Sequence, residues 1–486
     1  MSVLKDVEPA AVLKLFEEIS AIPRGSGNTE AICSFCTEFA EERKLKHHRD
    51  KAGNLVIWKE GSPGYEDSET LIIQGHLDMV CVKNSESNKN MEEEGLELML
   101  ENGIISADGT SLGADDGIAV AFALAILESN EISHPPLEVV LTADEETGMA
   151  GAMNLDLSIL KGRKLLNLDY EVEGVVIAGC AGAINCSMII PLREENVSCA
   201  LFSKRCTMHL DGCRGGHSGL EIDKGRANAI IMASRIYAKL HRSVDIRMLS
   251  FEGGEKANVI PQSAQISFVL RESDVQKVCS AAEEEMETIR KTLGQFDPDI
   301  KLTLAFDDNT NCRVFSDDSS GNIMDAVQIS PNGVMNYSPD IRNAVQTSSN
   351  LGVIGLYGSR CRVEYMIRSS VSGESNYVMA RLQMIADKVD GKVIKESEFP
   401  SWPVEHASEL RRIYSESYKS LFGKIPEAEA IHGGLECGIF AEGIQNIDCI
   451  SYGPQIEDIH SVHERVAVDS IDRTWKLTKE ILRRLK

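Results

Sequence analysis

The chain has 486 residues, of which 43% are hydrophobic and 26% are charged, and its formal net charge is -25. These fractions are typical of a soluble globular protein, and the length predicts two or three domains. The negative charge, without any block rich in Lys or Arg, disfavours nucleic acids and anionic membranes as partners. No apolar run approaches the roughly 18 residues that a membrane span requires.

The N-terminal segment and the cysteines predict a cytoplasmic protein. Residues 1–20 combine acidic and apolar side chains in the pattern of an amphipathic surface helix, which differs from a signal peptide. The 13 cysteines are scattered and odd in number, which favours free thiols in a reducing compartment. Cys33 and Cys36 could suggest a redox or zinc pair, but they lie in a helical pattern without a second pair, which favours a structural role.

The first 190 residues alternate short apolar runs with helical patterns. Interleaved strands and helices predict an open α/β sheet with helices on both faces. The clearest helix spans residues 117–128, and a hairpin is predicted over 96–107. The predicted strands cover residues 54–58, 71–74, 137–142 and 164–168.

The character of the chain changes between residues 191 and 399. Alternating strands at 205–210, 264–270 and 361–367 occur with two strong helices at 225–242 and 275–294. This combination predicts a separate α+β domain of antiparallel sheet and helices. After Pro400 the first pattern returns, with a helix at 407–421, a strand at 447–451 and a closing helix near 471–485.

His76 and Asp78 follow the apolar run 71–73, where a buried strand is expected to end. A carboxylate that accepts a hydrogen bond from one imidazole nitrogen fixes the tautomer and leaves the other nitrogen for a metal. Further acids and imidazoles occur beyond other predicted strands, and open α/β sheets bind ligands at the carboxyl ends of their strands. These candidates are Asp115, Glu145, Glu146, Asp169 and His460.

Each candidate also has a purely structural interpretation. Asp115 and its neighbour Asp116 precede a predicted helix and could be N-capping residues. The pair Glu145-Glu146 and Asp169 could belong to solvated turns, and His463 competes with His460 as the ligand.

Taken together, the segments resemble a known family in their order and wording. They are GHLD at 75–78, LGADDG at 112–117, TADEETG at 142–148, NLD at 167–169, GGHSG at 215–219, HGGLECG at 432–438 and HSxxE at 460–464. The chain resembles the M20 dinuclear metallopeptidases, and within them the aminoacyl-histidine dipeptidases. The resemblance covers almost the whole length.

The resemblance implies a two-metal hydrolase site. Asp115 would bridge both ions, His76 and Asp169 would complete one site, and Glu146 and His460 the other. Glu145 would be the general base, and Asp78 would orient His76. His217 would donate a hydrogen bond to the oxyanion from a lid domain, with Asn258 and Arg368 also contacting substrate. The family pattern places the ligand directly before Ser461, which favours His460 over His463.

The chemistry of these side chains agrees with that reading. Two divalent ions and three ligand carboxylates leave a net positive charge, which favours ionisation of water. Imidazole and carboxylate ligands suit zinc, with cobalt or manganese as alternatives, better than magnesium or calcium. Arg368 suits the free carboxylate of a short peptide. The segment 432–438 could present backbone N–H groups to that carboxylate or could simply begin a helix.

The predicted ligands are split between the two ends of the chain, so the catalytic domain is expected to be discontinuous. Residues 1–190 and 400–486 would form it, and residues 191–399 would be an inserted lid. The predicted function is hydrolysis of dipeptides, with aminoacyl-histidine dipeptides preferred. The alternatives are another amidohydrolase on the same site, such as an N-acyl amino acid deacylase or a different di- or tripeptidase, and a non-catalytic binding protein. The expected partner is a small peptide, and a homodimer is compatible with the sequence.

Overall fold

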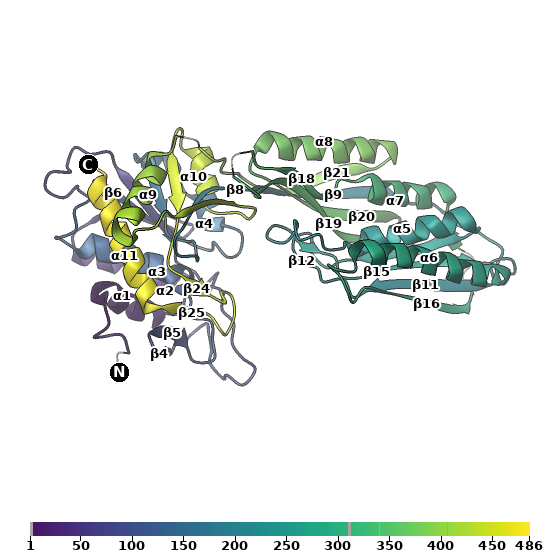
Figure 1. Cartoon of the computed structure of the whole chain (residues 1–486), viewed down its shortest axis with the longest axis horizontal. Coiled ribbons are helices and arrows are strands. Elements are labelled where there is room, and N and C mark those ends of the chain that lie inside the picture. Colours follow the sequence, from purple (N-terminus) through teal and green to yellow (C-terminus); the bar gives the residue numbers. More distant parts are fainter. Residues whose placement is uncertain (1–2, 310–312, 340, 406) are drawn as a thin grey trace. The chain divides into compact units, whose positions relative to one another are not determined.

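The computed structural model (Figure 1) describes residues 3–309, 313–339, 341–405 and 407–486. They form two compact units. Unit 1 comprises Met1–Cys180, Trp402–Ala430 and Leu435–Lys486, and unit 2 comprises Ala181–Ser401 and Ile431–Gly434. The division therefore falls about ten residues before the predicted boundary at 190/191. The reason is that strand β9 (Gly182–Pro191) pairs with two strands of unit 2, whereas its apolar sequence would suit either sheet.

Unit 1 is built on an eight-stranded mixed sheet in the order β1-β2-β6-β3-β7-β23-β8-β22. The central strands β6, β3, β7 and β23 are parallel, and β1, β2 and β8 are antiparallel to their neighbours. The five strands predicted for this sheet, at 54–58, 71–74, 137–142, 164–168 and 447–451, are confirmed within one or two residues. The strands are β1 (Lys46–Arg49), β2 (Leu55–Lys59), β3 (Leu71–His76), β6 (Leu137–Thr142), β7 (Lys164–Asn167), β8 (Val175–Cys180), β22 (Glu427–Ile431) and β23 (Asp448–Ser451).

A second, four-stranded sheet of unit 1 joins the predicted hairpin to the C-terminal part of the chain. The hairpin strands are β4 (Leu98–Glu101) and β5 (Ile104–Ala107), and β25 (Arg465–Ala467) pairs with β5. Strand β24 (Ile456–Glu457) completes the sheet beside β25. Residues from the two ends of the chain therefore belong to one unit.

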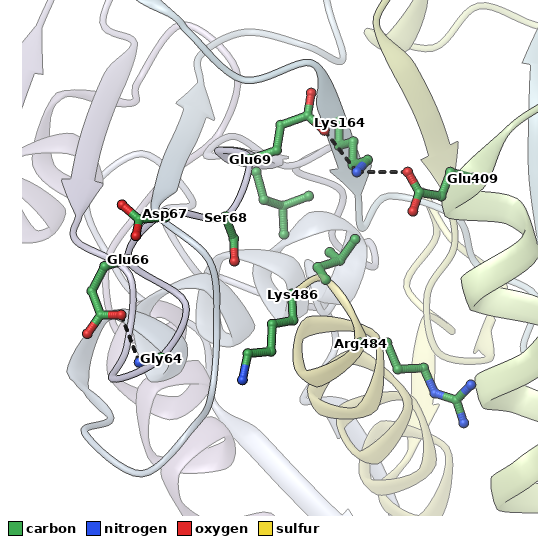
Figure 2. A pocket seen from close by; sticks show the side chains of 11 residues that line it. Gly64, Glu66, Asp67, Ser68, Glu69, Lys164, Glu409, Arg484 and Lys486 are labelled. Atoms are coloured by element: carbon green, nitrogen blue, oxygen red, sulfur yellow. Dashed lines mark hydrogen bonds and ion pairs between the residues drawn. The ribbon is translucent and has the colours of Figure 1, made fainter.

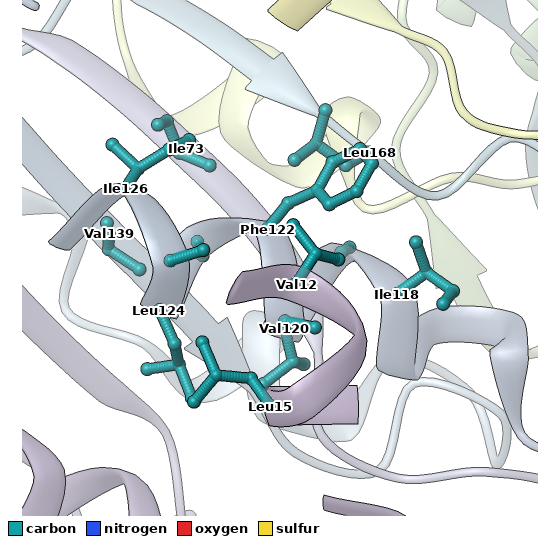
Figure 3. Packing of buried hydrophobic residues seen from close by; sticks show 14 of the residues in the cluster. Val12, Leu15, Ile73, Ile118, Val120, Phe122, Leu124, Ile126, Val139 and Leu168 are labelled. Atoms are coloured by element: carbon teal, nitrogen blue, oxygen red, sulfur yellow. The ribbon is translucent and has the colours of Figure 1, made fainter. Parts of the chain in front are cut away.

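Helix α3 (Ala114–Glu128) lies at the centre of the core of unit 1. It contacts α1 and strand β3, and every residue from Ala114 to Leu127 is buried. Figure 3 shows Phe122 and Leu124 among side chains of α1, β3 and β6. All residues of β3 and β6 are buried as well, which requires cover on both faces of the sheet. The helices are α1 (Ala10–Ser20), α2 (Glu30–Glu42), α3, α4 (Ala150–Asn154), α9 (Glu409–Phe422), α10 (Cys437–Gly443) and α11 (Val468–Arg484), with a 3-10 turn at Leu157–Ile159.

Unit 2 contains a nine-stranded sheet whose strand pairs are all antiparallel in the described residues. Burial alternates along β11, so one face of this strand packs on the core and the other is more open. The strands are β16 (Lys301–Asp308), β11 (Lys204–Asp211), β15 (Ala264–Leu270), β13 (Arg247–Gly253), β19 (Val345–Tyr357), β20 (Arg360–Ser369), β9 and β21 (Lys392–Phe399), with β18 (Gly333–Tyr337) beside β19.

Unit 2 also contains two short strand pairs outside the main sheet and a set of helices. The strand pairs are β10 (Glu194–Asn196) with β17 (Arg313–Phe315), and β12 (Gly216–His217) with β14 (Val259–Ile260). The helices are α5 (Ala229–Ser243), α6 (Val275–Leu293), α7 (Asp317–Ile329) and α8 (Ser372–Lys388), with a 3-10 turn at Glu272–Asp274. The two predicted helices, at 225–242 and 275–294, are confirmed as α5 and α6.

The cysteines agree with the sequence prediction at all but one described position. Eleven have free thiols, and Cys33 and Cys36 are buried in the core on helix α2. Cys199 is disulfide-bonded, so the prediction of free thiols is wrong there; the scattered spacing of the cysteines carried no signal for it. Among the helices of the described residues, none has the length and apolar character to cross a bilayer.

Candidate metal centre

Parallel strands bring the predicted ligands to one edge of the sheet in unit 1. Strand β3 is parallel to β6 on one side and to β7 on the other, so their carboxyl ends lie side by side. His76 is the last residue of β3, and Asp169 follows β7. The pair Glu145 and Glu146 follows β6. This is the edge at which open α/β sheets bind ligands.

The imidazole of His76 is buried between acidic side chains on both sides of the ring. Its Nδ1 lies 3.3 Å from Asp78 Oδ1. Its Nε2 lies 3.1 Å from Asp115 Oδ1 and 3.5 Å from Asp169 Oδ1. One ring nitrogen therefore faces the predicted orienting acid, and the other faces two predicted ligands.

Asp115 contacts a second histidine with its other carboxylate oxygen. Its Oδ2 lies 3.1 Å from His460 Nε2, and the same nitrogen lies 2.9 Å from Glu146 Oε1. These contacts raise the pKa of His460 to about 10. His463 is exposed and belongs to none of the metal-ligand groups found in the described residues, so the geometry favours His460.

Asp78 holds more of the site than the sequence predicts. Its carboxylate accepts hydrogen bonds from Ser26 Oγ at 2.8 Å and from the backbone N–H groups of Glu145 (3.0 Å) and Glu146 (3.2 Å). Burial opposes its ionisation, but His76 and these donors outweigh burial and lower the pKa of Asp78 to about 2. Asp78 therefore connects His76 to the turn that carries Glu145 and Glu146.

The loop before helix α3 is held by a carboxylate that the sequence did not single out for this role. Glu464 is 3% exposed and accepts the backbone N–H groups of Leu112 (2.9 Å), Gly113 (2.9 Å) and Ala114 (2.8 Å). The buried guanidinium of Arg24 donates to the carbonyls of Leu77, Asp78 and Gly113 on the same side. Glu464 stands in the HSxxE segment, which is a sequence signal, whereas nothing in the sequence marks Arg24.

The N-capping alternative for Asp115 and Asp116 is wrong. Neither side chain caps helix α3, and both residues have non-helical backbone angles. Asp116 Oδ2 instead accepts the backbone N–H of His76 at 3.0 Å. A Cβ on Gly75 would lie 2.6 Å from that oxygen, so the glycine permits this close approach.

Burial and mutual repulsion raise the pKa values of several acids in this cluster. Burial raises the pKa values of Glu145 and Asp116 well above their ordinary range, with Asp169 adding to both shifts. Burial also raises the pKa of Asp169 to about 6 and that of Glu171, a residue the sequence did not single out, to about 8. So many carboxyl groups in one buried place need cations to balance their charge.

The donor set fits divalent metal ions. Three groups of residues each offer three ligand atoms that lie within 4.8 Å of one another. The groups are His76–Asp116–Asp169, His76–Glu145–Glu146 and Asp115–Glu146–His460. Bound cations would offset the mutual repulsion that adds to burial in raising the pKa values of these acids. Imidazole nitrogen with carboxylate oxygen suits zinc, cobalt or manganese.

Unit 2 brings the three predicted substrate-binding residues into one region. His217 lies on β12, which pairs with β14 directly after Asn258, and the Ser218 N–H donates to the Asn258 carbonyl at 2.9 Å. His217 Nδ1 accepts the N–H groups of Gly219 (3.3 Å) and Leu220 (3.2 Å), which places the ring proton on Nε2. The Arg368 guanidinium lies 3.3 Å from that Nε2. The edge of the imidazole and a buried positive charge thus lie side by side, an arrangement that suits an anionic oxygen.

Burial lowers the pKa values of both His217 and Arg368. Burial and Arg368 lower the pKa of His217, so its ring is neutral near pH 7. Burial also lowers the pKa of Arg368 to about 10, and its Nε has no hydrogen-bond partner. A buried cation with an unpaired Nε–H is suited to pair a carboxylate.

The segment 432–438 is divided between the two units. His432 belongs to unit 2, where its Nε2 lies 2.7 Å from Ser348 Oγ. From Leu435 the chain belongs to unit 1, and helix α10 begins at Cys437. The end of the segment therefore is a helix start, as one of the two sequence interpretations held.

A pocket of about 570 Å³ lies at the opposite end of the strands from the metal-ligand groups. It is lined by Leu71 and Lys164, the first residues of β3 and β7. Figure 2 shows Lys164 between two acids, Glu69 and Glu409, each with an oxygen 2.9 Å from its Nζ. This charge is already paired, so the pocket contributes nothing to the candidate centre.

Comparison with known proteins extends the likeness to the full chain. The chain is 31% identical over 485 residues to the cytosol non-specific dipeptidase of Escherichia coli, covering 100% of this chain and 99% of that protein. The crystal structure of aminoacylhistidine dipeptidase from Vibrio alginolyticus superposes with a TM-score of 0.91 at 33% identity, covering 99% of this chain and 97% of that one.

A more distant structure shares the fold alone. Aminopeptidase PepT from Bacillus cereus matches with a TM-score of 0.57 at 16% identity, over 99% of both chains.

The model of peptidase family M20/M25/M40 matches residues 72–484. This range contains every predicted ligand from His76 to His460. The chain therefore belongs to peptidase family M20/M25/M40.

Proposed function

We propose that this chain is a metal-dependent dipeptidase. The observation that carries the proposal is the position of Asp115 between two imidazoles. Its two oxygens each lie 3.1 Å from a histidine nitrogen, Nε2 of His76 on one side and Nε2 of His460 on the other. A carboxylate in this position supports a centre for two divalent cations that share Asp115.

Each half of the centre has its own ligands in this proposal. His76 and Asp169 hold one cation with Asp115, and Glu146 and His460 hold the other. When bound, the cations polarise the scissile carbonyl and lower the pKa of water. Zinc is our choice, and cobalt and manganese have the same ligand preferences.

Glu145 acts as the general base. It takes a proton from the attacking water and passes the proton to the leaving amine. The position of its carboxyl supports this role, because Glu145 lies in one ligand-atom group with His76 and Glu146, beside the proposed cations. Asp78 supports both a proposed ligand and the proposed base, since it faces His76 Nδ1 and accepts a hydrogen bond from the backbone N–H of Glu145.

The donors of unit 2 suit the two anionic groups of dipeptide hydrolysis. His217 Nε2–H would donate to the oxyanion of the tetrahedral intermediate, which is worth a few kcal/mol in a water-poor site. Arg368 would pair the C-terminal carboxylate of the substrate, and Asn258 lies beside His217 to contact the substrate backbone.

The substrate is a dipeptide with a free amino terminus. Both full-length relatives described above are named as dipeptidases, one as non-specific and one as aminoacylhistidine. Within this class of substrate, we propose that dipeptides with a C-terminal histidine are preferred. We place the activity in the cytoplasm because the Escherichia coli relative is named for the cytosol.

A comparison of two substrate classes tests the proposal. Metal-loaded protein is assayed against alanyl-histidine, alanyl-alanine, N-acetyl-histidine and N-acetyl-alanine. We expect hydrolysis of both dipeptides, with alanyl-histidine faster. Activity on the acetylated amino acids alone would make the chain a deacylase.

A variant separates catalysis from binding. Glu145→Gln is expected to lower kcat by about 10²–10⁴-fold with unchanged metal content. Glu442→Gln, an exposed acid on helix α10, is the control and should keep wild-type turnover. If wild-type protein and the Glu145 variant are equally inactive on a broad dipeptide panel, the chain is a binding protein.

A further inference from the structure

Glu436 is a fully buried acid that the proposed reaction does not use. It directly precedes helix α10 and is 0% exposed. Its Oε1 has no hydrogen-bond partner among the described residues. A buried carboxyl that is only half satisfied costs free energy, so its presence calls for a compensating role.

The other oxygen of Glu436 joins a chain of buried polar side chains. Oε2 accepts hydrogen bonds from Gln74 Nε2 and from Thr142 Oγ1, the latter at 2.7 Å. Gln74 Oε1 in turn accepts a hydrogen bond from Asn167 Nδ2 at 2.6 Å. One carboxylate thus connects side chains of three adjacent parallel strands, β6, β3 and β7.

Each of these side chains stands two or three residues before a residue of the proposed metal centre. Gln74 precedes His76 by two residues on β3, so both side chains project from the same face of the strand. Asn167 precedes Asp169 by two residues. Thr142 lies opposite His76 in the strand register and is three residues before Glu145.

We propose that Glu436 is a positioning residue for the metal centre, acting through Gln74, Thr142 and Asn167 on the strand ends that carry the ligands. The inference rests on the proposed function, since it assumes that these ligands bind metal. Hydrogen bonds behind metal ligands commonly contribute 10–100-fold to metal affinity. Glu436 differs from such a residue because it contacts no ligand itself. It fixes the positions of β3, β6 and β7 relative to one another, and these strands carry the proposed ligands at their ends.

Metal affinity of the purified protein tests the proposal. Metal is removed with a chelator, and the dissociation constants for Zn²⁺ and Mn²⁺ are measured by competition with a chelating indicator. Glu436→Ala is expected to weaken binding about 10–100-fold. Glu436→Gln keeps an oxygen that accepts both hydrogen bonds and should keep most of the affinity. Glu442→Ala, an exposed acid on the same helix, should bind like wild type.

A second variant tests the network from the opposite side. Thr142→Val keeps the shape of the side chain but removes the hydroxyl donor, and it should weaken metal binding in the same direction. Because both residues act through one hydrogen bond, the double variant should lose less than the sum of the two single losses. Additive losses would contradict the network.

Two further outcomes would overturn the proposal. If Glu436→Ala lowers the melting temperature of the metal-free protein but leaves metal affinity unchanged, the residue only stabilises the fold. If Glu436→Gln loses as much affinity as Glu436→Ala, the hydrogen bonds are not what matters. A wild-type protein that binds no metal would instead contradict the proposed function and would be recognised before any variant is compared.

Discussion

Asp78 contacts three of the groups that the proposed reaction uses, although it binds no metal in the proposal. It faces His76 Nδ1 at 3.3 Å and accepts the N–H groups of Glu145 and Glu146. The contact with His76 was predictable because the two residues are two positions apart after a strand. The contacts with the turn at 145–146 were not predictable, because they join segments 67 and 68 residues apart.

Two substitutions separate a ligand from its orienting residue. His76→Ala should remove one equivalent of bound metal and nearly all turnover, because it deletes a ligand atom. Asp78→Ala should keep both metal ions with about 10–100-fold weaker affinity and lose most activity. Metal content by atomic emission and kcat measured on a dipeptide check both statements. His463→Ala is the control, since that side chain is exposed, and a loss of metal there would contradict the assignment of His460.

The pKa of Glu436 predicts a pH dependence of stability. Burial raises the pKa of this carboxyl from 4.5 to about 7, so the folded metal-free protein holds a proton that the unfolded chain has released between these values. Stability from this group is therefore present below pH 4.5 and is lost as the pH rises through 7. The full loss is about 3 kcal/mol for a shift of this size.

The Glu436→Gln variant removes that titration and serves as the comparison. Urea unfolding of the metal-free proteins at pH 5 and pH 8 should show the variant gaining stability relative to wild type at the higher pH. A difference between the two proteins that does not change with pH would contradict the raised pKa.

At the scale of the elements, short segments before and after the strands decide the geometry of the centre. Strand β3 ends at His76, and helix α3 presents Asp115 from a loop that Glu464 holds through backbone N–H groups. The close approach of helix and strand needs Gly75, where a Cβ would lie 2.6 Å from Asp116 Oδ2 and 2.9 Å from Ala119 Cβ. The packing of α3 on β3 therefore sets the position of the acid pair.

Gly75→Ala is expected to disturb this packing. Overpacking of this kind typically costs about 1–3 kcal/mol, and here the neighbour that must move is Asp116, which contacts the proposed ligand His76. Both the free energy of unfolding and the metal affinity should fall. Gly321→Ala is the matched control, because nothing lies within 4 Å of its added Cβ and the glycine stands inside helix α7. The control should be neutral or slightly stabilising, since alanine favours a helix. Equal effects of the two substitutions would contradict the packing argument.

Most long elements were predictable because their periodic patterns are local. Strands β2, β3, β6, β7 and β23 of the central sheet and helices α3, α5, α6, α9 and α11 lie within a few residues of the predicted positions, whereas β1, β8 and β22 were not predicted. The short strands β12, β14, β24 and β25 were not predictable. They contain two or three residues each, and such pairs form only because other segments bring their partners close.

At the scale of the whole molecule, a discontinuous unit holds all the proposed ligands. Unit 1 takes segments from both ends of the chain, and unit 2 is inserted between them. The predicted split of the ligands implies this arrangement, and the two compact units divide about ten residues before the predicted boundary at 190/191. Strand β9 is apolar enough for either sheet, and only its pairing with β20 and β21 assigns it to unit 2.

Metal should therefore stabilise one unit and not the other. A ligand that binds only the folded state stabilises it by about 2.7 kcal/mol at 100 times its dissociation constant. Differential scanning calorimetry of the metal-free protein should resolve two transitions, and added Zn²⁺ or Mn²⁺ should raise the temperature of only one. Proteolysis at intermediate temperature identifies the unit that melts first. Equal upward shifts of both transitions would contradict a centre confined to unit 1.

The types of the proposed ligands, their order along the chain and the strand ends that carry them were predictable from the sequence, because these depend on local pattern and residue chemistry. The tertiary structure decided which acids contact which imidazoles. It also revealed the contacts of Glu464, Arg24 and Glu436, whose partners lie far away in the chain. Such contacts arise when sheet pairing brings distant segments together, and no local pattern encodes their distances.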